Sequence, residues 1–228
     1  MDMYAITAEH PLLGILRNVP LEKTIDYADA AVRGGVAFFE VALNSPHALE
    51  QITMLRKHFG DRCLVGGGTA ITTDPVGRHQ VASILGAADD IRPVGMNCVQ
   101  MGAQFLLTPG TPVDVLEYCA KNDIALLPGV LTPSDVAVSL EYGFKTMKLF
   151  PAGSMPMSYL KDLKGPFDDT HYMAIGGVNP QNIRQFFDAG YLSVGLASSL
   201  MPKDAVAAND WETCEAYVRD LVSRISRN

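Results

Sequence analysis

The stretch "KTMKLFPAG", residues 145–153, places a lysine inside an apolar run of the kind that forms a buried strand. Met147 and Leu149 flank Lys148 and suit a strand covered on both faces, and Pro151 ends the run. Burial disfavours the charged form of an amine and lowers its pKa. We therefore expect the fold either to offset the cost of burying Lys148 or to use the altered amine for chemistry.

Short apolar runs of this kind recur along the whole chain. They are continuous rather than alternating, which is typical of parallel strands covered on both faces. The eight runs are 12–17, 38–43, 64–69, 105–110, 124–130, 144–151, 172–178 and 192–200. We expect each run to form one strand of a parallel sheet.

Amphipathic segments between the runs predict helices. Residues 21–35 carry one apolar stripe and end at a glycine pair, and residues 132–143 open with Thr132 or Ser134 as the N-cap. Residues 179–190 have a proline just inside the predicted start and a glycine just past the end. The last helix is predicted at 210–226, with an inner stripe of Trp211, Cys214, Tyr217, Val218 and Leu221.

Eight strands that each precede a helix, in a chain of 228 residues, predict a single (β/α)8 TIM barrel. An open doubly wound sheet would need fewer strands and usually a GxGxxG motif after the first strand, which "LLGILRNVP" lacks. No linker divides the chain, so we expect one domain over 1–228. The third and fourth runs are about 41 residues apart, and the extra residues near 70–95 predict an added loop with a short helix that can reshape the mouth of the barrel.

Composition narrows the class of protein. The net charge of −7 argues against nucleic acid as a partner, and no apolar run is long enough to cross a membrane. The N-terminus lacks a basic segment followed by an apolar one, so we expect a cytoplasmic protein. The four cysteines are far apart, which favours reduced thiols, and the five histidines are equally scattered. We therefore expect no metal site and no cofactor.

The carboxyl ends of the predicted strands are where barrel enzymes place their chemistry. Two ionisable side chains stand inside apolar strands near these ends, Glu40 in "FFEVAL" and Lys148 in "TMKLF". One interpretation is a structural ion pair that closes the core. The other is Schiff-base chemistry, because a desolvated, partly neutral amine attacks carbonyls and a nearby carboxylate can move its protons. Lys145, at the start of the strand, is expected to be solvated.

Glycine-rich turns follow the last two predicted strands. "AIGGVNPQNI" and "VGLASSL" occupy the place where barrels often bind phosphate through backbone N–H groups and a helix N-terminus. The second turn also carries Ser198 and Ser199. Together with the lysine and glutamate, these turns predict a phosphorylated substrate that contains a carbonyl.

Several stretches, in order along the chain, carry a resemblance to a known family. They are "ILR" 15–17, "EVALNSP" 40–46, "VGGGT" 65–69, "LLTPG" 106–110, "LPGVLTPSD" 127–135, "MKLFPA" 147–152, "IGGV" 175–178 and "GLASSL" 195–200. The chain resembles the KDPG/KDPGal aldolase family, class I aldolases that cleave 2-keto-3-deoxy-6-phospho sugar acids (6-phosphogluconate or 6-phosphogalactonate derivatives). The resemblance covers nearly the whole predicted barrel, and "MKLFP" and "EVALNSP" are its specific parts.

The resemblance implies a role for each matching residue. Lys148 would form the Schiff base, and Glu40 would act as general acid and base, through a water molecule. Arg17 and Thr69 would hold the carboxylate or a hydroxyl of the substrate. The remaining implied contacts are a phosphate site formed by Gly176, Gly177, Ser198 and the backbone of Ala197, and further substrate contacts from Asn44, Pro109 and Ile175. The products would be pyruvate and D-glyceraldehyde 3-phosphate, without a metal, and the assembly would be a homotrimer.

Three positions bear on which epimer is the substrate. Family members that act on the gluconate epimer typically carry arginine where this chain has Asn44 and threonine where it has Ile175. "LNSP" is instead similar to the galactonate branch, although Ala197 stands where that branch has glycine. These residues favour the galactonate epimer.

Two other functions remain open on the same scaffold. A phosphosugar isomerase or epimerase would use Glu40 as a base towards carbon and would form no imine. A non-catalytic barrel that binds a phosphorylated ligand would need neither side chain. Trapping an imine would exclude both.

Overall fold

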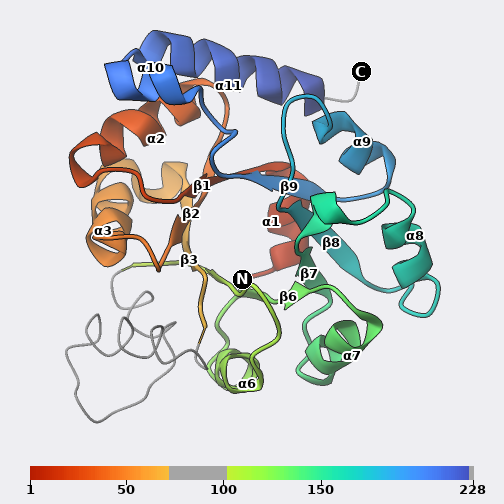
Figure 1. The fold of residues 1–228 in the computed structure, drawn as a ribbon. Helices are drawn as coiled ribbons and strands as arrows, with labels where there is room; N and C mark the ends of the chain where they lie inside the picture. The colour runs from red at the N-terminus through yellow and green to blue at the C-terminus, as the bar shows by residue number, and fades with distance from the viewer. Residues whose placement is uncertain (72–101, 226–228) are drawn as a thin grey trace.

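The structure, a computed structural model, describes residues 1–71 and 102–225 of the 228-residue chain. Parallel strands form a ring, and the helices surround it (Figure 1). The strands are β1 (Leu12–Leu16), β2 (Phe38–Ala42), β3 (Leu64–Gly68), β4 (Leu106–Leu107), β5 (Leu126–Leu127), β6 (Gly129–Val130), β7 (Thr146–Leu149), β8 (His171–Ile175) and β9 (Ser193–Leu196). Their order is β5-β4-β3-β2-β1-β9-β8-β7-β6, and every pair is parallel.

The predicted (β/α)8 barrel is confirmed, with one change in its strands. The run at 124–130 forms two short strands, β5 and β6, rather than one, because Pro128 between them has no N–H to donate to a ladder. β5 pairs with β4 and β6 pairs with β7. Since β5 and β6 are separated by a single residue, the chain itself closes the ring at this point.

The helices of the described residues follow the strands around the barrel. They are α1 (Met3–Glu9), α2 (Thr24–Arg33), α3 (Ala48–Phe59), α6 (Val113–Lys121), α7 (Pro133–Glu141), α8 (Tyr159–Lys164), α9 (Ile183–Asp188), α10 (Lys203–Ala208) and α11 (Trp211–Ile225), with short 3-10 turns η1 (Leu21–Lys23), η2 (Gly60–Arg62) and η3 (Ala152–Ser154). The loop and helix predicted near 70–95 lie outside the described residues from residue 72 on.

The four predicted helices are present with altered ends. Thr132, not Ser134, caps α7, in a reciprocal capping box with Asp135. The segment predicted at 179–190 becomes helical only at Ile183, because Asn179 and Asn182 cross-link the preceding turn, and Pro180 therefore lies before the helix. In α11 the predicted stripe is confirmed for Cys214, Val218 and Leu221, whereas Trp211 and Tyr217 are only partly buried and Ile225 completes the stripe.

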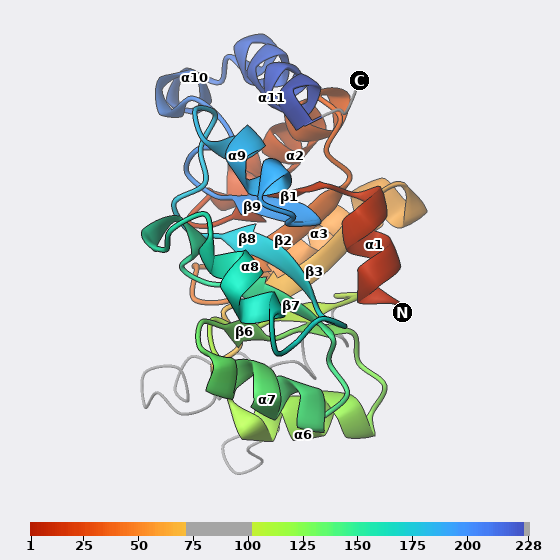
Figure 2. The ribbon, with the colours of Figure 1, turned by 90° about the vertical axis from the view of Figure 1, so that its right-hand side faces the viewer.

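The apolar core has two layers, because successive residues of a strand point to opposite faces. One layer fills the barrel and consists of Met3, Leu13, Ile15, Phe38, Phe105, Leu107, Leu127, Met173 and Ile175. The other lies between the strands and the surrounding helices. α1, which the sequence did not predict, lies across the end of the barrel where the strands begin (Figure 2), and its Met3 completes the inner layer. The chemistry is therefore left to the opposite end.

Two further properties of the described residues bear on the sequence expectations. Cys63, Cys119 and Cys214 are free and buried, and Cys98 lies outside the described residues. No helix among the described residues is both long and apolar enough to cross a membrane.

Candidate active site

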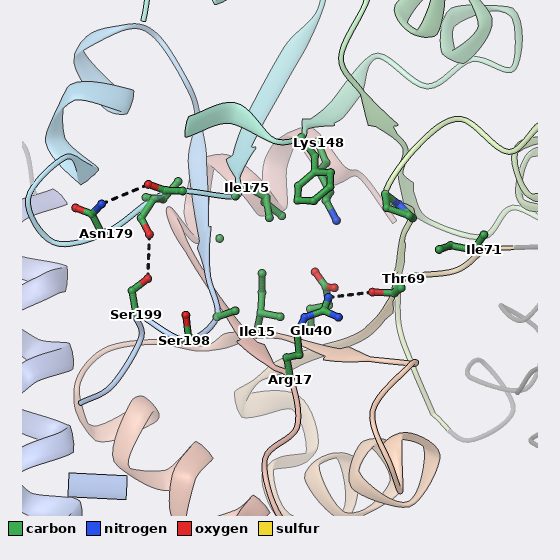
Figure 3. A pocket seen from close by; sticks show the side chains of 17 residues that line it. Ile15, Arg17, Glu40, Thr69, Ile71, Lys148, Ile175, Asn179, Ser198 and Ser199 are labelled. Atoms are coloured by element: carbon green, nitrogen blue, oxygen red, sulfur yellow. Dashed lines mark hydrogen bonds between the residues drawn. The ribbon is translucent and has the colours of Figure 1, made fainter. Parts of the chain in front are cut away.

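A cavity of about 550 Å³ opens at the carboxyl ends of the strands. All of the predicted site residues except Asn44 line it: Arg17, Glu40, Thr69, Pro109, Lys148, Ile175, Gly176, Gly177, Ala197 and Ser198. Figure 3 shows Lys148, Glu40, Thr69 and Arg17 toward one side of this pocket and Asn179, Ser198 and Ser199 at the other. The site therefore has an ionisable half and a half built from glycine turns.

Lys148 and Glu40 enter the barrel from separate strands and point toward one another (Figure 3). Lys148 lies on β7 between Gly129 of β6 and Met173 of β8, and Glu40 lies on β2. Both are buried, with 4% of Lys148 and 1% of Glu40 exposed. Such burial of two ionisable side chains is rare unless a function or a close partner requires it.

The close partner is missing. Within residues 1–71 and 102–225, neither the Lys148 Nζ nor the Glu40 carboxylate makes an ion pair or a hydrogen bond, and the buried Glu40 Oε2 is without any partner. A structural ion pair, one of the two interpretations from the sequence, would bring the charges into contact. The structure shows no such contact, and both side chains line the cavity.

The environment shifts both pKa values toward the neutral forms. Burial lowers the pKa of Lys148, an effect that the Arg17 charge reinforces and the Glu40 carboxylate partly opposes. Burial raises the pKa of Glu40, while the positive charges of Lys148 and Arg17 oppose the rise. A neutral amine is the nucleophilic form of lysine, and a protonated carboxyl group can donate a proton.

Gly68 makes room for the glutamate. A Cβ at this position of β3 would lie 1.7 Å from Glu40 Oε1, which no real contact allows. Because Gly68, the last glycine of "VGGG", has no side chain, the Glu40 carboxylate can occupy the space beside it.

Arg17 is held by two residues from the segments that follow β2 and β3. Its guanidinium donates to the Asn44 Oδ1 at 2.8 Å and to the Thr69 Oγ1 at 3.1 Å. Asn44 therefore contacts Arg17 and does not line the cavity. Thr69 adopts a φ of 64°, which a β-branched residue rarely adopts, and such strain is concentrated at functional sites.

Three successive carbonyl groups of the first glycine turn are each bound by a donor. The Gly176 carbonyl accepts from the Gly153 N–H at 2.7 Å, and the Gly177 carbonyl accepts from the Asn182 Nδ2 at 2.9 Å. The Val178 carbonyl accepts from the Ser199 Oγ at 2.9 Å (Figure 3). In the described part of the chain, the N–H groups of Gly177 and Val178 donate to no protein acceptor. Free N–H groups in a turn with positive φ form a concave site for an anion.

The second turn completes this half of the pocket. The Ser199 hydroxyl donates to the Val178 carbonyl, whereas the exposed Ser198 hydroxyl has no protein partner among the described residues. The choice of Ser198 as the ligand-facing serine is therefore consistent with the hydrogen bonds.

The sequence alone gave no role to the lining residues Ile15, Ile71 and Phe150. It placed Val178, Asn179, Gly195 and Ser199 in the predicted phosphate-binding turns but assigned them no individual contacts. Strand alternation could have found Ile15, which lies two residues before Arg17 on the same inward face. Phe150 follows Lys148 by two and its ring centre is 5.1 Å from the Lys148 Nζ. Asn179 lies in the first predicted phosphate-binding turn, where no periodic pattern distinguishes it from its neighbours. Lys145, expected to be solvated, is exposed and ion-paired with Asp169.

No group of three or more potential metal ligands occurs within the described ranges. The chemistry that these residues can carry out is that of an amine, a carboxyl group and an anion-binding turn.

Comparison with known proteins identifies the family of this chain. A family model described as KDPG and KHG aldolase matches residues 3–217. The chain belongs to this aldolase family. It is 28% identical to the 2-dehydro-3-deoxy-6-phosphogalactonate aldolase of Escherichia coli strain K12, over 92% of this chain and 93% of that protein. It is 29% identical to the KHG/KDPG aldolase of the same strain, over 96% of this chain and 93% of that protein.

A solved structure extends the likeness to the fold of the aldolase. The KDPG aldolase of Legionella pneumophila, with pyruvate captured at low pH as a covalent carbinolamine intermediate, has a TM-score of 0.80 and 27% identity, over 97% of this chain and 98% of that one. Family membership and the fold make this chain an aldehyde-lyase with a (β/α)8 barrel. The isomerase and the non-catalytic barrel are not favoured.

Proposed function

We propose that this chain is a class I aldolase that cleaves a 2-keto-3-deoxy-6-phospho sugar acid to pyruvate and D-glyceraldehyde 3-phosphate. One observation carries the proposal: a buried Lys148 faces a buried Glu40 across the pocket without touching it. The relatives support it, because their names include aldolases for both phosphorylated epimers and one was captured with pyruvate as a carbinolamine.

The proposed reaction begins at the amine. The neutral Lys148 Nζ attacks the C2 carbonyl of the substrate, and the carbinolamine loses water to form a protonated imine. Glu40, as general base, takes the proton of the C4 hydroxyl through a water molecule. The C3–C4 bond then breaks, its electron pair moves into an enamine, and the aldehyde leaves. Glu40 returns a proton to C3, and hydrolysis releases pyruvate and the free lysine.

The two halves of the pocket suit the two ends of this substrate. Arg17, held by Thr69 and Asn44, offers a guanidinium to the C1 carboxylate. The free N–H groups of Gly177 and Val178, with the Ser198 hydroxyl and the Ala197 backbone, offer donors to the phosphate. Pro109 and Ile175 supply apolar wall between them.

The imine itself is the test. Pyruvate followed by borohydride should add a reduced three-carbon adduct to Lys148, located by peptide mass spectrometry. Lys148→Arg should remain folded and form no adduct, because a guanidinium does not form the carbinolamine. Lys145→Arg is the matched control and should be modified like the unaltered chain. An adduct on Lys145, or no adduct, would refute the proposal and return the isomerase and the non-catalytic barrel to consideration.

We extend the proposal to the epimer. Ile175 is apolar and Asn44 is turned toward Arg17, so neither offers a hydroxyl or guanidinium that would favour the gluconate configuration. An apolar wall rejects an extra or inverted hydroxyl only weakly. The chain should therefore cleave the galactonate-derived epimer at least as well as the gluconate one. Measured kcat/KM values for both decide this, and a strong gluconate preference would contradict it.

We also propose that the protein is cytoplasmic and assembles as a homotrimer, as the family resemblance implies. Sedimentation equilibrium of the purified protein tests the assembly. A mass of one or two chains at micromolar concentration would contradict it.

A further inference from the structure

The glycine turn of the pocket is held from outside the pocket. Asn182 is half-buried and does not line the cavity, yet its Nδ2 donates to the Gly177 carbonyl at 2.9 Å. Asn179, which does line the cavity, approaches the same carbonyl only at 3.4 Å. Asn182 is thus the principal donor to this carbonyl.

The position of Asn182 is itself fixed by a reciprocal pair of bonds. The Asn179 N–H donates to the Asn182 Oδ1 at 2.8 Å, and the Asn182 N–H donates to the Asn179 Oδ1 at 3.1 Å. With its oxygen fixed as an acceptor, the carboxamide of Asn182 must direct its amino group to the Gly177 carbonyl. The side chain therefore has one orientation.

Fixing a carbonyl fixes the next N–H group. A trans peptide is planar, and its C=O and N–H bonds point in opposite directions. The bond from Asn182 to the Gly177 carbonyl consequently aims the Val178 N–H the other way, and the bond from Gly153 to the Gly176 carbonyl does the same for the Gly177 N–H. These are the two N–H groups that have no protein acceptor in the described residues.

The turn needs such restraint because its glycines can rotate. Gly176 and Gly177 have φ values of 88° and 77°, a region that glycine enters and leaves at little steric cost. Rotation of the Gly177–Val178 peptide would present a carbonyl oxygen to the pocket in place of an N–H. A carbonyl oxygen repels a phosphate oxygen.

We propose that Asn182 is a positioning residue for phosphate binding, which holds the Gly177–Val178 peptide so that its N–H group faces the pocket. This inference rests on the proposed function in that the natural anion is taken to be the substrate phosphate. It adds a residue that touches neither the substrate nor the reacting atoms.

The first test compares a phosphorylated substrate with its unphosphorylated analogue. Asn182→Ala should lower kcat/KM for the phosphorylated 2-keto-3-deoxy sugar acid on the order of 10- to 100-fold, mainly through KM, because a small displacement of a binding group has effects of this size. The unphosphorylated analogue should change by no more than about three-fold. Equal loss on both substrates would show a merely structural role and overturn the proposal.

A second variant and a matched control sharpen the result. Asn182→Asp keeps an oxygen that accepts from the Asn179 N–H but cannot donate to the Gly177 carbonyl, so it should show the same selective loss if Asn182→Ala fails to fold. Asn122→Ala is the control: the Asn122 Nδ2 donates to the Tyr118 carbonyl at 2.8 Å, at the end of α6. It should leave both substrates unaffected.

Inorganic phosphate gives a readout that needs no aldol cleavage. Calorimetric titration should show on the order of 10-fold weaker binding to Asn182→Ala than to the unaltered protein. Trapping of pyruvate on Lys148 should be the same in both. If pyruvate were not trapped by the unaltered protein, the proposed function would fail while the phosphate titration still tested the turn. Unchanged phosphate binding in Asn182→Ala would overturn the positioning role.

Discussion

Lys148 and Glu40 are the residues whose physical situation is hardest to explain by stability alone. Two buried ionisable groups that do not touch each lose hydration without gaining a direct partner. Their pKa values shift toward the neutral forms as a result. These shifts favour the nucleophilic form of the amine, which imine formation requires.

The charges around Lys148 predict two opposite pH effects. Carbinolamine formation needs the neutral amine, so the rate of pyruvate trapping should rise with pH through the pKa of Lys148. The Glu40 carboxylate raises this pKa and Arg17 lowers it. Glu40→Gln should therefore move the midpoint of the trapping profile to lower pH, and Arg17→Met should move it to higher pH.

The measurement is the borohydride trapping rate against pH at saturating pyruvate, so that weaker binding in Arg17→Met does not enter. Glu40→Gln should in addition slow aldol turnover by roughly 10²–10⁴-fold, since it removes the proton carrier. Midpoints that move together, or that stay with the unaltered protein, would contradict the assigned electrostatics.

At the scale of elements, β3 makes room for Glu40 because Gly68 has no Cβ. In Gly68→Ala the new Cβ would overlap the Glu40 carboxylate, so the side chain must leave its place. We expect a loss of turnover comparable to that of Glu40→Gln and a destabilisation of about 1–3 kcal/mol from overpacking. Steady-state kinetics and denaturant unfolding measure the two effects.

Gly110→Ala is the matched control for that substitution. No heavy atom lies within 4 Å of a Cβ at Gly110, and its φ is not in the left-handed region. It should retain both activity and stability. Normal turnover in Gly68→Ala would show that Glu40 does not act from the position seen in the structure.

The elements also show how far the sequence leads. The strands were predictable, apart from the division of 124–130 into β5 and β6, because apolar runs indicate burial on both faces. Lys148 and Glu40 were identifiable because they interrupt such runs. The bond from Arg17 to Asn44 and the bond from Asn182 to the Gly177 carbonyl depend on turn geometry and on partners that only folding brings together. Local sequence patterns do not predict such contacts.

At the scale of the whole molecule, the two ends of the barrel have separate tasks. The pocket opens where the strands end, and α1 closes the barrel where they begin (Figure 2). This helix was missed in the sequence because it is short and presents only a few apolar residues to the core. Its contribution should therefore be visible in stability and not in chemistry.

Met3→Asp tests this separation of stability from catalysis. Met3 is 6% exposed and packs inside the barrel, so a carboxylate there would be buried without a partner. We expect the free energy of unfolding to fall by about 3 kcal/mol or more, which corresponds to a fall in Tm of roughly 6–12 °C for a chain of this size. Ala5→Asp places the same side chain on an exposed position of the same helix and should have little effect on stability.

In the folded fraction of Met3→Asp, pyruvate should still be trapped on Lys148 at the unaltered rate, because the substitution lies at the far end of the barrel from the pocket. Equal Tm values for the two variants would show that α1 does not stabilise the barrel, and slowed trapping in Met3→Asp alone would show that the two ends are coupled.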